Sequence, residues 1–290
     1  MKTNSNTLHL AYEEAIQFAR KHYENFPVVS FLIQKKLRKH IAIIYWFART
    51  ADDIADEGDL SLEQRLEQLA RLEKRLQNLL NGIYADKFDY ALAETIKENK
   101  LSNILFFKLL KAFRSDILFK NFQEFQNVIG YCDNSANPIG RLILELHDIR
   151  DPKAMLLSDS ICTALQLTNF YQDFKVDIQK GRNYIPLSDL TKFGLNENNF
   201  TDPTLRSKLC EVMKYQIERA KNLFIEGEAL LNYLPKRLKI EIAWTILGGR
   251  TILEKIEATR CNVFKNRPSL KKYEMITLLI KSYSYAKRFS

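Results

Sequence analysis

Apolar residues recur at helical spacing along almost the whole chain, and strict alternation of apolar and polar residues is hard to find over more than four residues. The 290 residues include only 9 Gly and 7 Pro, about half the usual frequency of these turn formers, which disfavours a many-stranded β fold. With 46% hydrophobic residues the chain can fill a core. No internal repeat, low-complexity tract or linker is present. The pattern therefore predicts an all-α protein with one domain over residues 1–290.

The periodicity predicts helices over residues 7–24, 36–56, 61–81, 88–98, 101–117, 121–136, 138–147, 155–179, 203–232, 236–259 and 269–287. Turn chemistry supports several boundaries. Asp151-Pro152 and Asp202-Pro203 are typical helix starts, because proline suits the first helical position. Asn137-Pro138 predicts a kink or a break inside a periodic stretch. The longest irregular stretch is expected over residues 181–202.

Membrane insertion is not expected from the sequence. The longest purely apolar run, Ile41 to Ala48, has eight residues, whereas a helix needs roughly 20 to span a bilayer. Charged residues also interrupt the first 25 positions, which disfavours a signal peptide. We therefore expect a cytoplasmic protein that is soluble or that contacts the inner face of the membrane peripherally.

The net charge of +9, with an isoelectric point near 9.2, favours an anionic partner. Phosphate esters, nucleic acid and anionic membranes all qualify. Most of the excess positive charge lies between Lys255 and Ser290, a stretch that contains nine Lys or Arg and two Glu. This stretch can attract a polyanion or a membrane surface. Alternatively, it is the solvated face of a terminal helix whose apolar stripe packs inward, namely Ile276, Leu279, Ile280 and Tyr283.

Two aspartates near the end of the predicted helix 36–56 form a first acidic cluster. Asp52 and Asp56 are four residues apart, about 40° around a helix and about 6 Å along it, so both carboxylates lie on one face. No cation four residues further on pairs with either of them, and Arg49 lies on the same face. Like charges at this spacing destabilise a helix, and a bound cation would reverse that effect.

A second acidic row lies in the predicted helix 155–179. Asn169, Asp173 and Asp177 follow one another at four-residue intervals, so three oxygen-bearing side chains share one helix face. With 15 Asp in the chain, one such aspartate pair is expected by chance. The row that also includes Asn169 is much rarer, and its occurrence beside a second acidic pair is moderately strong support for a site.

Carboxylate and amide oxygens without His or Cys suit Mg²⁺, which commonly links protein carboxylates to substrate phosphates. Two such clusters with nearby arginines would bind a diphosphate and stabilise the charge that develops when its bond to carbon breaks. The alternative is that both clusters are solvated acidic helix faces. The residues favour ionisation of a diphosphate ester in a helical bundle.

The sequence resembles the squalene/phytoene synthase family from about Tyr12 to Leu270. The resemblance rests on five ordered blocks: His22 to Pro27, Tyr45 to Asp56, Tyr131-Cys132 with Ala136 and Gly140, Leu165 to Asp177, and Gly181 to Pro186. It implies an all-α isoprenoid-synthase bundle with a central prenyl-binding cavity. It also implies Mg²⁺ as cofactor and a prenyl diphosphate as substrate, with no role for nucleic acid.

The resemblance further implies roles for individual residues. Mg²⁺ would be held by Asp52, Asp56, Asn169, Asp173 and Asp177. The diphosphate or its metal shell would be contacted by His22, Tyr45, Arg49, Gln166, Arg182, Tyr184 and Arg267. Tyr131 would stabilise a cation through its ring face or pass a proton. Ala136 and Gly140 would leave room for a prenyl chain, unless they serve close helix packing instead.

One departure from the family pattern concerns the second acidic row. Many members that join two prenyl diphosphates carry an acid directly before the last aspartate, whereas Lys175 and Val176 precede Asp177 here. Within the family, the blocks Glu24 to Pro27, Ser135 to Arg141 and Gln179 to Arg182 are most similar to bacterial hydroxysqualene synthases. This similarity implies conversion of presqualene diphosphate and water to hydroxysqualene. Head-to-head condensation of two prenyl diphosphates and a non-enzymatic basic helical binding protein are the alternatives.

Overall fold

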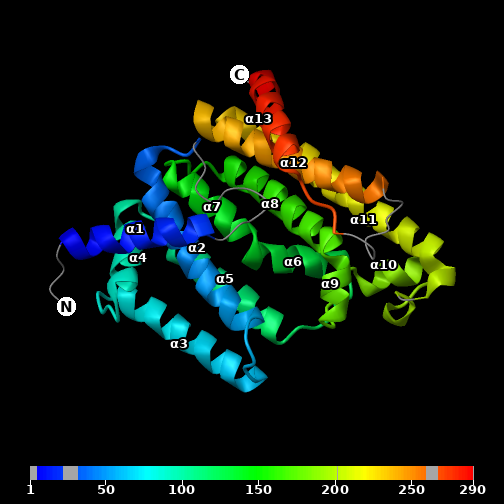
Figure 1. Ribbon diagram of the computed structural model, residues 1–290, viewed down its shortest axis with the longest axis horizontal. Coiled ribbons are helices and arrows are strands. Elements are labelled where there is room, and N and C mark those ends of the chain that lie inside the picture. The colour runs from blue at the N-terminus through cyan, green and yellow to red at the C-terminus, as the bar shows by residue number, and fades with distance from the viewer. Residues whose placement is uncertain (1–4, 22–31, 201, 259–266, 290) are drawn as a thin grey trace. The chain divides into compact units, whose positions relative to one another are not determined.

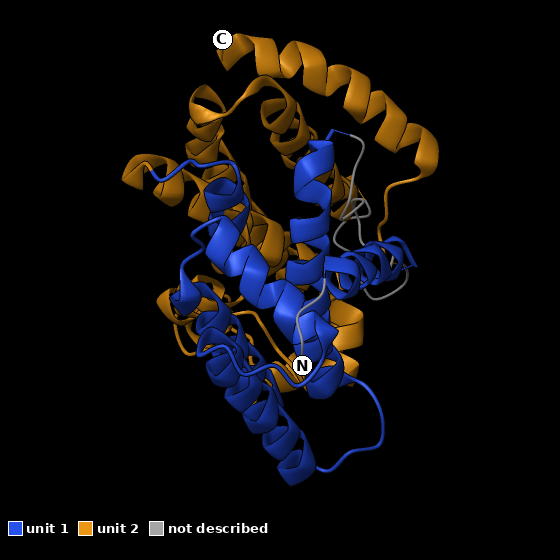
Figure 2. Cartoon of the chain, turned by 90° about the vertical axis from the view of Figure 1, so that its left-hand side faces the viewer, with its two compact units in different colours: residues 1–118, 141–150 blue, residues 119–140, 151–290 orange. Residues whose placement is uncertain are grey.

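The computed structural model describes residues 5–21, 32–200, 202–258 and 267–289. These ranges contain helices, turns and loops but no strand, which confirms the predicted all-α class (Figure 1). The chain divides into two compact units, coloured separately in Figure 2. Unit 1 comprises residues 1–118 and 141–150, and unit 2 comprises residues 119–140 and 151–290.

Unit 1 contains five helices and the end of a sixth: α1 (Ser5–Lys21), α2 (Lys35–Asp56), α3 (Leu62–Leu80), α4 (Lys87–Glu98), α5 (Asn103–Ile117) and the second half of α7 (Asn137–Leu146). The apolar run predicted from the sequence lies in α2 and forms the centre of this unit. Ile41, Ile43 and Phe47 are at most 5% exposed, and Phe47 meets Phe106 of α5 edge to face at 5.5 Å. Among the helices of the described ranges, none combines the length and apolar character that crossing a bilayer requires.

Unit 2 contains the start of α7 and seven further helices: α6 (Phe125–Ser135), α8 (Pro152–Gln172), α9 (Phe174–Gln179), α10 (Leu187–Lys192), α11 (Arg206–Gly227), α12 (Lys236–Ala258) and α13 (Lys272–Ala286). Short 3₁₀ segments cover Glu197–Asn199, Pro203–Leu205, Glu228–Tyr233 and Lys287–Phe289. Helix α8 packs against α6, α11 and α12. Its Ile161, Ala164 and Leu167 are at most 3% exposed.

The helix boundaries follow the turn chemistry of the sequence. Asp151 caps α8 by accepting a hydrogen bond from the Ala154 amide at 2.9 Å, and Pro152 is the first helical residue. Helix α6 ends at Ser135 and α7 begins at Asn137, so the expected break before Pro138 is confirmed. Two expectations were wrong. The predicted helix 155–179 is divided at Asp173 into α8 and α9, and the stretch 181–202 contains the short helix α10.

A buried polar network links three helices of unit 1. His40 of α2 is 2% exposed, and its Nδ1 lies 2.9 Å from the Thr95 hydroxyl of α4. The same hydroxyl is 2.8 Å from the Tyr12 hydroxyl of α1, which also donates to the Ala91 carbonyl at 3.1 Å. Burial, aided by the charge of Lys39, lowers the pKa of His40 to about 4. The imidazole is therefore neutral in the native protein at physiological pH.

This network predicts a loss of stability in acid. The unfolded chain takes up a proton at His40 below pH 6.5, whereas the native chain does so only near pH 4. Stability is therefore fully present above pH 6.5 and falls by roughly 3 kcal/mol as the pH drops to 4. We expect the free energy of unfolding in urea to fall less between pH 7 and pH 5 in His40→Gln than in the wild type. Equal pH dependence of the two proteins would contradict this account.

Candidate active site

The first acidic cluster lies in the last two turns of α2, as the sequence predicted. Asp52 and Asp56 are both half-buried on this helix. Arg49, which the sequence placed on the same helix face, reaches three carboxylates of this segment. Its Nη1 lies 3.1 Å from Asp52 and its Nε 2.6 Å from Asp53, and its Nη2 contacts Glu57. Burial opposes the charge of Arg49, but these carboxylates outweigh it and raise the pKa of the guanidinium.

The position of this cluster is electrostatically unfavourable without a cation. The last turn of a helix carries partial negative charge, and carboxylates there are destabilising. Arg65 of α3, which the sequence reasoning did not identify, relieves part of this charge. It donates to the Ala55 carbonyl at 2.7 Å and to the Gly58 carbonyl at 2.8 Å. Arg65 therefore caps α2 and fixes the turn that carries Asp52 and Asp56.

The second acidic row lies at the junction of α8 and α9 in unit 2. Asn169 is exposed near the end of α8, Asp173 occupies the junction, and Asp177 lies in α9. The four-residue backbone hydrogen bonds continue through the junction, from the Asp173 amide to Asn169 at 2.8 Å and from the Asp177 amide to Asp173 at 3.0 Å. The row therefore keeps its helical spacing although the helix is interrupted.

Arg267 pairs with the central residue of this row. Arg267 binds the Asp173 carboxylate through two nitrogens. Its Nε donates to Oδ1, and its Nη2 donates to Oδ2 at 3.1 Å. The arginine lies 94 residues further along the chain. A bidentate arginine leaves each carboxylate oxygen with lone pairs for another ligand. Both acidic clusters therefore combine carboxylates with an arginine.

A turn at Gly181, directly after α9, positions the backbone of Arg182 beside the second acidic row. The Gly181 amide donates to the Ile178 carbonyl at 3.0 Å, and the Arg182 amide donates to the Asp177 carbonyl at 2.8 Å. These bonds form a Schellman motif, which requires a left-handed residue at the glycine position; Gly181 has φ of +75°. The motif explains why Gly181 precedes Arg182 and places the backbone of Arg182 next to the last turn of α9.

Tyr131 and Tyr184, predicted separately from the sequence, belong to one aromatic cluster in unit 2 with Phe119, Phe122 and Phe170. Tyr184 stacks on Phe170 with ring centroids 3.7 Å apart. Tyr131 lies 5.7 to 6.1 Å from the rings of Phe122, Phe170 and Tyr184. Aromatic faces attract cations within about 6 Å. The aromatic cluster is therefore a candidate for stabilising a carbocation, through ring faces other than the two that Phe170 and Tyr184 stack on each other, and its phenylalanines were not identified from the sequence.

Asn183 holds Tyr184 in this cluster. The Asn183 side chain accepts a hydrogen bond from the Ile185 amide at 2.9 Å and donates to the Ile185 carbonyl at 3.0 Å. Asn183 is 4% exposed and Tyr184 is 8% exposed. The side-chain amide of Asn183 therefore satisfies the backbone N–H and C=O of Ile185 in this buried loop. In this way it fixes the orientation of Tyr184. The sequence block contained Asn183, but its positioning role depends on the folded loop.

The remaining predicted residues have simpler surroundings. Tyr45 is half-buried in α2, and its ring lies 6.2 Å from that of Phe18. Gln166 is half-buried on α8, one turn before Asn169. His22 lies outside the described residues. The structure therefore brings together Arg49 with Asp52, Arg267 with Asp173, and Tyr131 with Tyr184.

Gly140 serves helix packing rather than the space for a prenyl chain that the resemblance suggested. A Cβ at this position would lie 2.4 Å from Cys162 Sγ and 2.5 Å from Ser158 Oγ, both on α8. We expect Gly140→Ala to lower the free energy of unfolding by about 1 to 3 kcal/mol, because the packed neighbours must move. Gly130→Ala in α6 is the matched control, since nothing lies within 4 Å of its Cβ. Equal unfolding midpoints in urea for both variants would contradict the packing role.

The two acidic clusters fit Mg²⁺ by their donor chemistry. Each offers only carboxylate or amide oxygens, and Mg²⁺ accepts one or two protein carboxylates when water and phosphate complete its shell. Within the described ranges, no three His, Cys, Asp or Glu side chains converge on one point. A Mg²⁺ ion at either cluster would complete its shell with water and phosphate oxygens.

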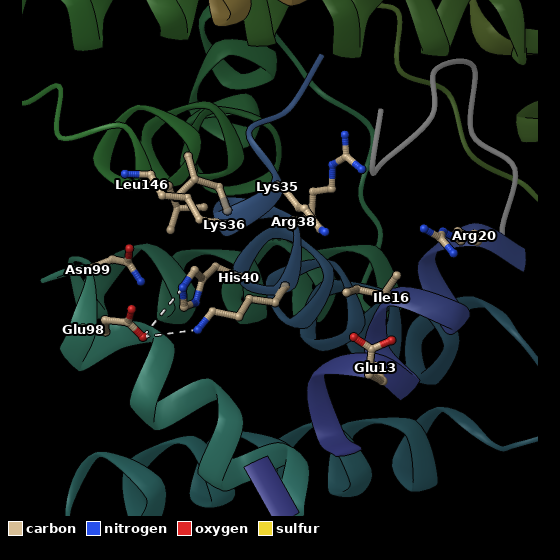
Figure 3. A pocket seen from close by; sticks show the side chains of 12 residues that line it. Glu13, Ile16, Arg20, Lys35, Lys36, Arg38, His40, Glu98, Asn99 and Leu146 are labelled. Carbon is tan, nitrogen blue, oxygen red and sulfur yellow. Dashed lines mark ion pairs between the residues drawn. The ribbon is translucent and has the colours of Figure 1, made fainter. Parts of the chain in front are cut away.

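A separate cavity of about 570 Å³ lies within unit 1. It is lined by residues of α1, α2 and α4, with five basic side chains and with Glu13 and Glu98 (Figure 3). Lys39 and His40 both lie 3.7 Å from Glu98. None of the candidate site residues described above lines it. This cavity is therefore distinct from the acidic clusters.

Comparisons with known proteins identify the family of this chain. Residues 19–274 match the squalene/phytoene synthase family. Phytoene synthase 1 from Arabidopsis thaliana is 28% identical over 281 residues, which cover 94% of this chain and 66% of that protein. The 15-cis-phytoene synthase of Synechocystis sp. is 27% identical over 269 residues, covering 89% of this chain and 80% of that protein. The chain thus spans just under two thirds of the longer Arabidopsis protein.

Solved structures show the same fold. Squalene synthase HpnC from Alicyclobacillus acidocaldarius is 32% identical, with a TM-score of 0.83 over 89% of this chain and 97% of that one. A dehydrosqualene synthase superposes with a TM-score of 0.87 over 98% of this chain and 99% of that one, at 22% identity. The fold is therefore that of the isoprenoid synthases. From the family match, the ordered motifs and this fold together, the chain belongs to the squalene/phytoene synthase family.

Proposed function

We propose that the protein converts presqualene diphosphate and water to hydroxysqualene and diphosphate. The observation that carries the ionisation step is the aromatic cluster, whose Phe170 directly follows Asn169 of the acidic row and whose Tyr184 follows Arg182 by two residues. Each of these two segments, at the end of α8 and after α9, thus carries one residue for holding a diphosphate and one for stabilising a carbocation. The 32% identity to squalene synthase HpnC supports a squalene-forming pathway.

The diphosphate is bound by arginines and acidic residues with distinct tasks. Arg49, Arg182 and Arg267 neutralise its charge, helped by His22, Tyr45 and Gln166. Mg²⁺ would be held by Asp52, Asp56, Asn169, Asp173 and Asp177, and when bound it stabilises the negative charge on the leaving diphosphate. The carbon–oxygen bond breaks, and the diphosphate departs with the electron pair.

The aromatic cluster acts on the carbon skeleton. The faces of Tyr131, Phe170 and Tyr184 stabilise the cyclopropylcarbinyl cation and its rearranged successor. These buried rings also keep water away until the rearrangement is complete. Water then adds to the cation and loses a proton, which gives the alcohol. No nicotinamide reductant takes part in this sequence.

Val176 favours this reaction over condensation. An acid at this position would offer a further carboxylate to a metal ion, whereas Val176, which is 43% exposed, and Lys175 before it offer none, so the metal and the diphosphate would be held differently than in enzymes that join two substrates. We expect purified protein with Mg²⁺ to form hydroxysqualene from presqualene diphosphate. Product from farnesyl diphosphate alone, with none from presqualene diphosphate, would contradict the proposal.

Head-to-head condensation of two prenyl diphosphates is the second candidate. It is favoured by the 26 to 28% identity to phytoene synthases over most of the chain. Incubation with farnesyl diphosphate and with geranylgeranyl diphosphate, each alone, tests it directly. Formation of a C30 or C40 hydrocarbon from either substrate would establish this activity instead.

Removal of divalent cations is expected to abolish turnover. Without a cation, the carboxylates at the end of α2 and at the α8–α9 junction repel a diphosphate, so the substrate neither binds nor ionises. We expect diphosphate release to fall to background in excess EDTA and to recover when Mg²⁺ is added. Far-UV circular dichroism in EDTA serves as the control for folding. A rate that survives chelation would contradict the metal assignment.

A further inference from the structure

Helix α13 carries a stripe of large apolar side chains on its outer face. Tyr273, Ile276, Ile280 and Tyr283 are 63, 60, 68 and 44% exposed. Their spacing confines them to about 80° of the helix circumference. The alternative in which Ile276, Ile280 and Tyr283 pack inward was therefore wrong. The other large exposed apolar side chains of the described ranges occur singly in different elements, as Ile104 does in α5 and Ile225 in α11.

The opposite face of α13 is firmly attached within unit 2. Leu278, Ser282 and Ala286 are at most 7% exposed against α12. Trp244 of α12 donates a hydrogen bond to the Met275 carbonyl at 3.0 Å, and Lys255 of α12 contacts Glu274 at 2.6 Å. Figure 1 shows α13 crossing α12 near the C-terminus, and the two helices are in contact. The orientation of the helix is therefore fixed, and the apolar stripe faces away from α12.

Basic side chains accompany the apolar stripe. Lys272 lies beside Tyr283 in angular position, Lys281 lies about 80° beyond Tyr273 on the other flank of the helix, and Lys287 follows the stripe at its C-terminal end. All three are exposed. The one acidic residue of α13, Glu274, is occupied by Lys255. The outer face of the helix is therefore apolar and aromatic along its centre and positively charged at its edges.

We propose that this outer face of α13 docks the protein on the surface of a membrane that contains anionic phospholipids. An amphipathic helix of this kind lies in the interface plane, with its apolar side chains below the headgroups and its lysines at the phosphates. Tyrosines suit the headgroup level because they have an apolar ring and a polar hydroxyl. The charge of the lysines selects an anionic lipid surface over a second copy of this chain, whose same face would repel it.

Vesicle sedimentation tests the proposal without any substrate, so its result is independent of the proposed reaction. The full-length protein is mixed with vesicles of phosphatidylglycerol and phosphatidylcholine in equal parts, and with vesicles of phosphatidylcholine alone. We expect binding to the anionic vesicles and little binding to the neutral ones. Added salt weakens the binding, because it screens the lysines.

Two variants and a matched control locate the surface. We expect Ile276→Ser with Ile280→Ser to weaken vesicle binding at least about 10-fold, because two exposed isoleucines no longer enter the bilayer. Lys281→Gln is expected to weaken it about fivefold. Ile104→Ser with Ile225→Ser removes two equally exposed isoleucines from elsewhere and should bind as the wild type does. Thermal unfolding shows whether each variant is folded.

Three results would overturn the proposal. The first is a wild-type protein that stays in the supernatant with anionic vesicles. The second is a folded isoleucine double variant that binds as tightly as the control. The third is a wild-type dimer in sedimentation velocity that the isoleucine double variant converts to a monomer, because the face would then bind a second copy of the chain.

Discussion

Asp173→Asn is expected to lower the rate of diphosphate release about 100- to 1,000-fold, the typical cost of removing one group that stabilises charge in a transition state. The asparagine keeps the size of the side chain, so the junction between α8 and α9 is preserved. It removes the negative charge that would hold a cation and that pairs with Arg267. Release of diphosphate from presqualene diphosphate at saturating Mg²⁺ measures the effect.

Asp148→Asn is the matched control for this substitution. Asp148 lies in unit 1, its side chain is 95% exposed, and its φ of +58° is one that asparagine tolerates well. We expect this variant to retain the wild-type rate. A folded Asp173→Asn protein with more than about a third of the wild-type rate would contradict the role of the acidic row in ionisation.

Asp189→Ala is expected to destabilise the native protein by about 3 to 5 kcal/mol, because it leaves a partly buried arginine without its counter-ion. Asp189 of α10 is 5% exposed. It accepts hydrogen bonds from Gln216 at 2.8 Å and from two nitrogens of Arg219. The guanidinium lies over the rings of Phe125 and Tyr215, with its carbon 4.1 and 4.4 Å from their centroids. Urea unfolding measures the change.

A double substitution distinguishes loss of the Asp189–Arg219 ion pair from loss of side-chain packing. Asp189→Leu with Arg219→Met replaces both charges by apolar groups, and exchanges of this kind are often neutral. We therefore expect the double variant to be more stable than Asp189→Ala. A loss below about 1 kcal/mol in Asp189→Ala, the range of an exposed ion pair, would contradict the structural role of this pair.

Most of the helices could be predicted from the sequence, because long segments with a 3.6-residue apolar period have few alternatives. The two errors have different causes. Helix α10 has six residues, too few for the period to appear, and tertiary contacts of Asp189 hold it in place. The interruption at Asp173 leaves the apolar period of the sequence unchanged, so the pattern did not reveal it.

The orientation of α13 shows a second limit of sequence patterns. The periodicity identified an apolar stripe with Ile276 and Ile280, but a stripe does not reveal which side of the helix has a neighbour. Helix α12 packs instead against the face of α13 that carries Leu278, Ser282 and Ala286. Small side chains allow the close approach of the two helices there, and the larger apolar residues remain outside.

The site could be predicted in part. Acidic residues at four-residue spacing are visible in a helix, so the rows containing Asp52 and Asp173 were found from the sequence. The aromatic cluster could not be found in this way, because its rings come from segments as far apart as Phe119 and Tyr184. The capping role of Arg65 likewise depends on the turn between α2 and α3.

The source of the oxygen atom in the product tests the proposed reaction most directly. Presqualene diphosphate is incubated with the protein and Mg²⁺ in water enriched in ¹⁸O. If the carbon–oxygen bond breaks and water captures the carbocation, the product is hydroxysqualene with the heavy oxygen in its hydroxyl group, and the released diphosphate is unlabelled. Label in the diphosphate together with unlabelled presqualene alcohol would show attack of water on phosphorus and would contradict ionisation at carbon.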